Sequence, residues 1–154
     1  MFRKNRIKFK VDGKPPQKSQ WGTSDAILVI KLREAALEAR TKIGLEKCFT
    51  NHVKLKLTVY APNIDDRDYK QSGDDDPKKY IGDLDSLVAG VCDYLYHGPE
   101  PGNNFVLSPL FDTKPEIGPE VSLIIEDDSQ ITSIISEKKI SDSLYYVVEI
   151  ESIS

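Results

Sequence analysis

Residues 53–60, VKLKLTVY, alternate strictly between apolar and polar side chains. This alternation is typical of a β-strand with one buried face, because successive side chains point to opposite sides of the strand. Residues 5–12, NRIKFKVD, repeat the pattern, and residues 144–151, LYYVVEIE, are rich in residue types that favour strands. Three segments spread along the chain therefore predict a sheet with one apolar face.

Two amphipathic helices are predicted between these strands. The first runs from Ser24 or Asp25, either of which could cap it, to about residue 43, and the second spans about 84–97. Both segments carry apolar side chains at spacings of three and four. Glycines at positions 44 and 98 favour the two ends, because glycine readily adopts the conformation that follows a helix.

The remaining segments are less regular. Residues 121–126 predict a short strand or a turn, and residues 130–138 a weaker strand. Residues 98–120 are rich in proline and glycine and predict a functional lid or a mobile insertion. Together the segments predict an α+β fold, in which two main helices pack against a mixed β-sheet. We expect a single domain over residues 1–154, with an irregular insertion at about 98–120.

The net charge of −4 hides an uneven distribution. Residues 1–60 contain 14 Lys and Arg against 5 Asp and Glu, whereas residues 61–154 contain 7 against 20. Such asymmetry indicates either nucleic-acid binding or attraction between the two halves within one fold. The chain has no apolar run long enough to span a bilayer and no apolar signal segment near its start. We therefore expect a cytoplasmic protein that does not enter a membrane, with Cys48 and Cys92 as reduced thiols.

Two acidic clusters carry the candidate chemistry. Asp83 and Asp85 stand at the start of the second helix, and Asp127 and Asp128 precede the weaker strand. Mg²⁺ prefers oxygen ligands and uses few carboxylates together with water and substrate phosphate. Two acidic pairs from separate elements could supply that set. The alternatives are that the first pair only caps a helix and that the second only forms a turn.

Several motifs in this order resemble the RusA family of Holliday junction resolvases. The shared features are a strand followed by prolines, an acidic motif that opens a helix ending in D-x-L, a second acidic motif, and a final strand. In this chain they are Lys10–Lys18 with Pro15 and Pro16, Asp83-Leu84-Asp85-Ser86-Leu87, Asp93-Tyr94-Leu95, Asp127-Asp128-Ser129-Gln130-Ile131, and residues 144–151. The resemblance covers most of the chain apart from residues 98–120.

The resemblance implies a homodimeric, Mg²⁺-dependent endonuclease that nicks four-way DNA junctions in recombination and repair, with Mn²⁺ as a substitute ion. It implies catalytic roles for Asp83, Asp85 and Asp128, with Asp127 as a further metal ligand, and DNA contacts at Lys14 and Lys18. Lys8 and Lys10 of the basic strand are further candidates for phosphate contacts. Trp21 could stack on an unpaired base or pack against the first helix.

The chain also departs from the family pattern. Family members often carry a lysine four residues after the second aspartate, where this chain has Ala89. Lys78 or Lys79 could replace it by folding back from the loop before the helix, or they could be solvated. A non-catalytic DNA-junction or protein-binding module that retains the fold is therefore the alternative function. A metal-binding interaction domain unrelated to DNA is a third.

Overall fold

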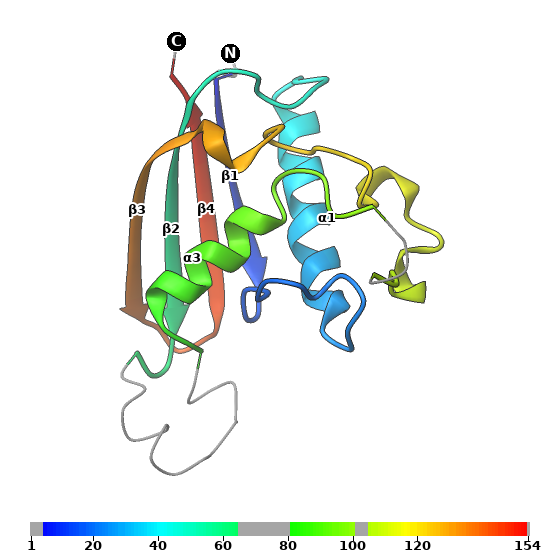
Figure 1. The fold of residues 1–154 in the computed structure, drawn as a ribbon. Helices are drawn as coiled ribbons and strands as arrows, with labels where there is room; N and C mark the ends of the chain where they lie inside the picture. The colour runs from blue at the N-terminus through cyan, green and yellow to red at the C-terminus, as the bar shows by residue number, and fades with distance from the viewer. Residues whose placement is uncertain (1–4, 65–80, 101–104, 154) are drawn as a thin grey trace.

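The structure is a computed structural model and is described for residues 5–64, 81–100 and 105–153. Its centre is one four-stranded sheet in the order β1-β4-β2-β3. The strands are β1 (Arg6–Asp12), β2 (Val53–Ala61), β3 (Ile131–Ile140) and β4 (Tyr145–Ser152). β4 pairs antiparallel with β1 and β2, whereas β2 and β3 are parallel. Two helices, α1 (Ala26–Lys42) and α3 (Leu84–Asp93), lie on one face of this sheet (Figure 1). The predicted α+β fold with a mixed sheet and two helices is thus confirmed.

The alternating patterns place the core between sheet and helices. Every second residue of β1 is buried, as is every second residue of β4 from Tyr146 to Ile150, and β2 follows the same alternation over its first five residues. Their apolar side chains meet the buried face of α1, which includes Val29, Ile30 and Leu32. The opposite face of the sheet carries the charged positions, including Lys8, Lys10, Lys54 and Lys56. Burial of one apolar face is the main driving force for this two-layer arrangement.

The second helix is shorter than predicted. It ends at Asp93 rather than at about residue 97. The carbonyls of Tyr94 and Tyr96 turn away to accept hydrogen bonds from Arg33 Nη1, at 2.9 and 3.0 Å. The carbonyl of Leu95 accepts the amide of Ile124 at 2.9 Å. These bonds to distant segments replace the ones that a longer helix would have made.

Two further boundaries differ from the sequence expectation. Residues 121–126 form no regular strand and contribute one isolated parallel bridge, between Ile125 and Phe49. Gln130 belongs to a 3₁₀ turn, η3 (Asp128–Gln130), so the following strand starts one residue later and runs on to Ile140.

The described part of the insertion packs against α1. It contains two short 3₁₀ turns, η1 (Pro109–Phe111) and η2 (Pro115–Ile117). Arg33 donates to the carbonyls of Ile117 and Gly118, both at 2.8 Å, and of Val121 at 2.7 Å. Trp21 is 2% exposed, and its ring lies 5.4 Å from that of Phe111. Trp21 therefore packs in the core, as one of its two predicted roles requires, and is not available to stack on a base.

Candidate carboxylate site

The first acidic pair is positioned by a turn that only glycine adopts easily. Gly82 has φ of 102°, in the left-handed region, and directs the chain into α3. Asp83 then occupies the N-cap position with an extended backbone, and Asp85 lies in the first turn. The Asp83 side chain makes no capping hydrogen bond, although its carbonyl accepts the amide of Leu87 at 3.0 Å. The Asp83 carboxylate therefore does not cap the helix. The helix dipole stabilises the negative charges of both Asp83 and Asp85 at this end of α3.

The second acidic pair sits on η3, which a capping box holds in place. The Asp127 carboxylate accepts the hydroxyl of Ser129 at 2.9 Å, and Gln130 Oε1 accepts the amides of Glu126 and Asp127 at 2.7 and 3.0 Å. Gln130 Nε2 donates to the carbonyls of Phe49 and Asn51, each at 2.9 Å. Gln130 thereby ties the turn to the segment that leads into β2. Asp127 is engaged in the turn, whereas Asp128 projects from it.

Asp85 and Asp128 line one cavity of about 300 Å³ between α3, β3 and the loop after β1. Asp93 of α3 and Lys18 of the loop line the same cavity, and Ile134 of β3 closes one side. An adjoining pocket of about 450 Å³ is lined by Asp83, Asp85, Lys18 and Ala89, among others. Asp85, Lys18 and Ala89 belong to both. Asp127 is not among the residues that line either pocket.

Asp93 is a member of this cluster that the sequence did not single out as a ligand. It follows Asp85 by eight residues, which is close to two helical turns and keeps both on neighbouring parts of the α3 surface. This spacing was the one feature of the sequence that could have identified Asp93. It does not suffice alone, because it does not show that Asp128 and Lys18 pack beside this side of the helix.

The charges in the cavity act on one another. A hydrogen bond with Asp127, burial, and the nearby charges of Asp127 and Asp93 raise the pKa of Asp128, while Lys18 opposes the rise. Hydrogen bonds from Ser129 and Asp128 lower the pKa of Asp127. Burial, together with Asp128 and Asp93, raises the pKa of the Cys92 thiol to about 11. Cys92 is therefore protonated at neutral pH and is not an activated nucleophile.

The donor set suits a hard cation more than zinc. The cavity offers three aspartates and one protonated thiol, and a bound Mg²⁺ takes oxygen ligands and keeps several waters. Within residues 5–64, 81–100 and 105–153, no group of three or more His, Cys, Asp or Glu side chains is close enough to hold one ion. A site with two carboxylates, water and substrate phosphate does not require such a group.

The four predicted DNA-binding lysines within residues 5–64 do not form one surface. Lys18 lies beside the carboxylates, and Lys14 lines a neighbouring pocket with Gln17. Lys8 and Lys10 lie on the edge strand β1, and the exposed residues of that strand face away from the side that α1 covers. Lys78 and Lys79 lie outside the described residues. Among the predicted lysines that the structure describes, Lys18 is therefore the one that the fold brings to the aspartates.

No model of a known protein family matches the sequence, and no curated protein matches it. The RusA resemblance thus remains a prediction. No helix in the part of the chain that the structure describes is long and apolar enough to cross a bilayer.

Proposed function

We propose that this protein is a Mg²⁺-dependent, structure-selective endodeoxyribonuclease that resolves Holliday junctions in the cytoplasm during DNA recombination and repair. One observation carries the proposal. Asp85 and Asp93 of α3 and Asp128, which lies 35 residues after Asp93, line one cavity together with Lys18. Enzymes that hydrolyse phosphodiesters commonly use carboxylates to hold a divalent metal ion and a basic side chain to neutralise the phosphate.

Each residue has a role in this proposal. Asp85 and Asp128 would hold the ion, Asp83 would bind its water ligands from the adjoining pocket, and Mn²⁺ would serve as a substitute. The bound metal would polarise the phosphate and lower the pKa of a water ligand. Asp127 would act indirectly, because its carboxylate is bonded to Ser129 and its neighbour Asp128 lines the cavity. Lys18 Nζ would stabilise the negative charge that develops on the phosphate.

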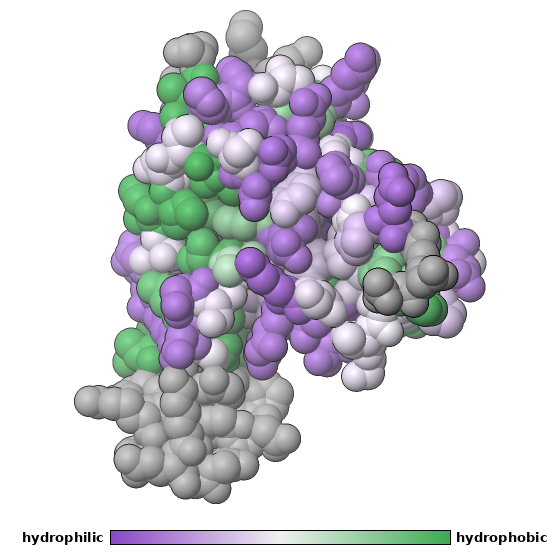
Figure 2. Space-filling model, viewed as in Figure 1, coloured by the Kyte–Doolittle hydropathy of each residue, from purple (hydrophilic) through white to green (hydrophobic). Residues whose placement is uncertain are grey.

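A homodimer is part of the proposal, because a four-way junction must be cut twice and closed two-fold assemblies are the common solution. The edge strand β3 is the candidate interface. It carries the exposed isoleucines Ile134, Ile135 and Ile140, and Ile134 also lines the carboxylate cavity. Figure 2 shows hydrophobic surface along the side of the molecule where β3 lies. Pairing through β3 would bring two cavities into one assembly.

Cleavage of a synthetic four-way junction in Mg²⁺ tests the proposal. Asp85→Asn removes a ligand charge but preserves side-chain shape, so we expect the cleavage rate to fall by at least ~100-fold while junction binding is retained. Asp128→Asn should behave alike. Asp112→Asn is the matched control, because Asp112 lies after η1 in the insertion and lines neither pocket of the site. Cleavage by Asp85→Asn at the wild-type rate would contradict the assignment.

Ala89 favours a second candidate, a non-catalytic module that binds DNA junctions or a protein partner. Its small side chain stands between Asp85 and Asp93, where the RusA resemblance leads one to expect a lysine. Wild-type protein that binds junctions tightly but never cuts them in Mg²⁺ or Mn²⁺ would support this candidate. Failure to bind any form of DNA would instead favour the metal-binding interaction domain.

A further inference from the structure

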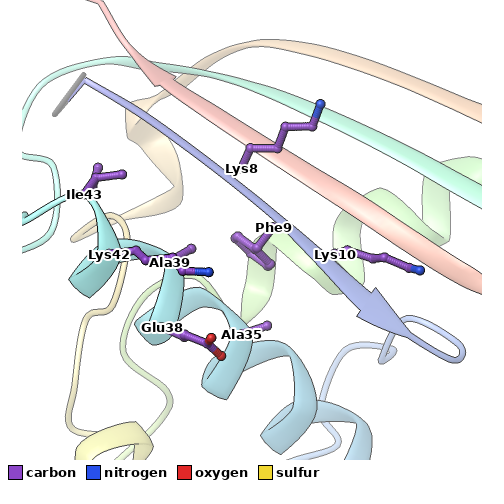
Figure 3. A pocket seen from close by; sticks show the side chains of 8 residues that line it. All are labelled: Lys8, Phe9, Lys10, Ala35, Glu38, Ala39, Lys42 and Ile43. Carbon is purple, nitrogen blue, oxygen red and sulfur yellow. The ribbon is translucent and has the colours of Figure 1, made fainter. Parts of the chain in front are cut away.

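The outer edge of β1 and the neighbouring surface of α1 enclose a groove that the nuclease proposal does not use. β1 is the terminal strand of the sheet and pairs with β4 on one side. The groove has a volume of about 350 Å³ and lies on the other side of the strand, against α1 (Figure 3). An edge strand beside a concave surface is the arrangement that accepts an added strand.

The register of β1 directs backbone groups into this groove. The amide of Ser152 donates to the carbonyl of Asn5 at 2.7 Å, and the amide of Gly13 donates to the carbonyl of Leu144 at 2.9 Å. These bonds bracket β1 and identify the odd-numbered residues as those that bond to β4, because hydrogen-bonded pairs alternate in an antiparallel ladder. The amide and carbonyl groups of Lys8 and Lys10 therefore point outward, where no other described strand pairs with β1.

The floor of the groove is lined by apolar residues, two of which are small. Phe9 points from β1 toward α1 (Figure 3), and its side chain is largely buried. Ala35 and Ala39 lie one turn apart on α1, and Ile43 follows one turn later. Because the two alanines are small, they leave room between helix and strand. A strand laid beside β1 would place every second side chain over this floor.

The strand that borders the groove is basic. Lys8 and Lys10 line the groove, with side chains that project to the face of the sheet away from α1 (Figure 3), whereas Lys42 and one acidic residue, Glu38, line it from α1. Lys10 Nζ lies 3.8 Å from Asp12 Oδ1 and 4.4 Å from the centre of the Tyr145 ring, so it is already partly engaged. A second copy of β1 would set lysines against lysines across the new strand pair, which is unfavourable. A strand with carboxylates at alternate positions would face those lysines instead.

We propose that this groove binds an extended, acidic segment of a partner protein, which pairs with β1 as a fifth strand. Main-chain hydrogen bonds to Lys8 and Lys10 give the affinity. Acidic residues facing the lysines, alternating with apolar residues over Phe9 and the two alanines, give the specificity. The groove and the carboxylate cavity share no lining residue, so this binding is independent of the nuclease proposal.

Fluorescence anisotropy with a capped, labelled Glu-Val-Glu-Val-Glu-Val peptide tests this proposal on the full chain. We expect saturable binding, and at least tenfold weaker binding by the double variant Lys8→Glu/Lys10→Glu. Both side chains are exposed, so the variant should fold. The matched control is Lys54→Glu/Lys56→Glu, which makes the same charge change at exposed positions of β2 and should leave affinity within twofold. A Lys-Val peptide of equal length should show the reverse preference between wild type and the β1 variant.

Two further measurements separate strand addition from charge attraction. Methylating the peptide nitrogens that face β1 should abolish binding, and the unmodified peptide should slow hydrogen exchange at the amides of Lys8 and Lys10. Ala39→Phe, which fills the groove, should also reduce affinity at least tenfold. No binding, equal binding by the methylated peptide, or unchanged exchange would overturn the proposal. Binding of duplex DNA that depends on Lys8 and Lys10 while the peptide fails to bind would overturn it in favour of nucleic acid.

Discussion

Arg33 shows how much one side chain can organise at the scale of a residue. Its guanidinium lies in the core, and all five N–H groups donate to carbonyls of residues 94–121 at 2.7–3.0 Å. Its Cζ lies 4.8 Å from the centre of the Trp21 ring, within range of a cation–π interaction. Burial lowers the pKa of Arg33 to about 9, so the group still carries its charge at neutral pH.

We predict that Arg33→Met lowers the free energy of unfolding by at least about 3 kcal/mol, because several buried carbonyls lose a charged donor at once. Arg33→Lys keeps the charge but offers fewer donors and should lie between Met and wild type. Arg40→Met is the control on the same helix, since Arg40 makes one hydrogen bond of this kind to the described residues, to the carbonyl of Leu123 at 2.9 Å. Urea unfolding followed by circular dichroism measures all three. Equal losses for Arg33→Met and Arg40→Met would contradict the prediction.

At the scale of an element, α3 acts as the scaffold of the carboxylate cavity. Asp85, Ala89 and Asp93 succeed one another at intervals of four residues, so they run along one side of the helix. The close approach of Gly90 to the carbonyl of Pro16 lets the proline loop pack against this helix, since an added Cβ would lie 2.1 Å from that oxygen. The same loop carries Lys18 to the cavity.

This packing predicts that Lys18 supplies the positive charge that Ala89 cannot. Lys18→Ala should reduce junction cleavage roughly 10–100-fold, because it removes the cation beside the phosphate. Adding Ala89→Lys to that variant should restore much of the rate, since position 89 lines the same cavity one turn from Asp85. Single-turnover cleavage assays measure both effects, with junction binding recorded separately. The prediction is wrong if the double variant is no faster than Lys18→Ala.

The elements that could be predicted from the sequence are those decided by local pattern. The alternation of β1 and β2 and the three-four spacing of α1 appear in the chain itself. The structure confirms these two strands and this helix, although β2 alternates only over its first five residues and Ile27 of α1 is exposed. The end of α3 could not be found in this way, because the bonds that end it come from Arg33, about sixty residues earlier. Asp93 was missed as a cavity residue for a related reason. Its neighbours in the cavity, Lys18 and Asp128, become neighbours only through tertiary packing.

At the scale of the whole molecule, the uneven charge of the chain is partly resolved within the sheet. The acidic strand β4 lies between the basic strands β1 and β2. Glu149 is opposite Lys8 on one side and Lys56 on the other, and it accepts a hydrogen bond from Arg6. Burial opposes ionisation of Glu149, but Arg6, Lys8 and Lys56 outweigh it and lower its pKa. Opposite charges from the two halves of the chain thus attract each other within the sheet. Lys18 takes no part in this attraction and lines the carboxylate cavity.

The two edge strands of the sheet, β1 and β3, differ in the side chains that they expose, and this difference predicts which edge forms a dimer. The β1 edge is rich in lysine, which discourages pairing with itself, whereas β3 exposes Ile134, Ile135 and Ile140. We predict a dimer through β3 that Ile135→Lys converts to a monomer, because the charge would be buried in the interface. Light scattering over a range of concentrations measures this. The control is Ile27→Lys, since Ile27 is an isoleucine of similar exposure on α1, 48% against 57% for Ile135. If the dimer is also the nuclease, the Ile135→Lys monomer should nick one strand of a junction without the paired second cut. Wild-type protein that is itself monomeric by light scattering would contradict the proposed interface.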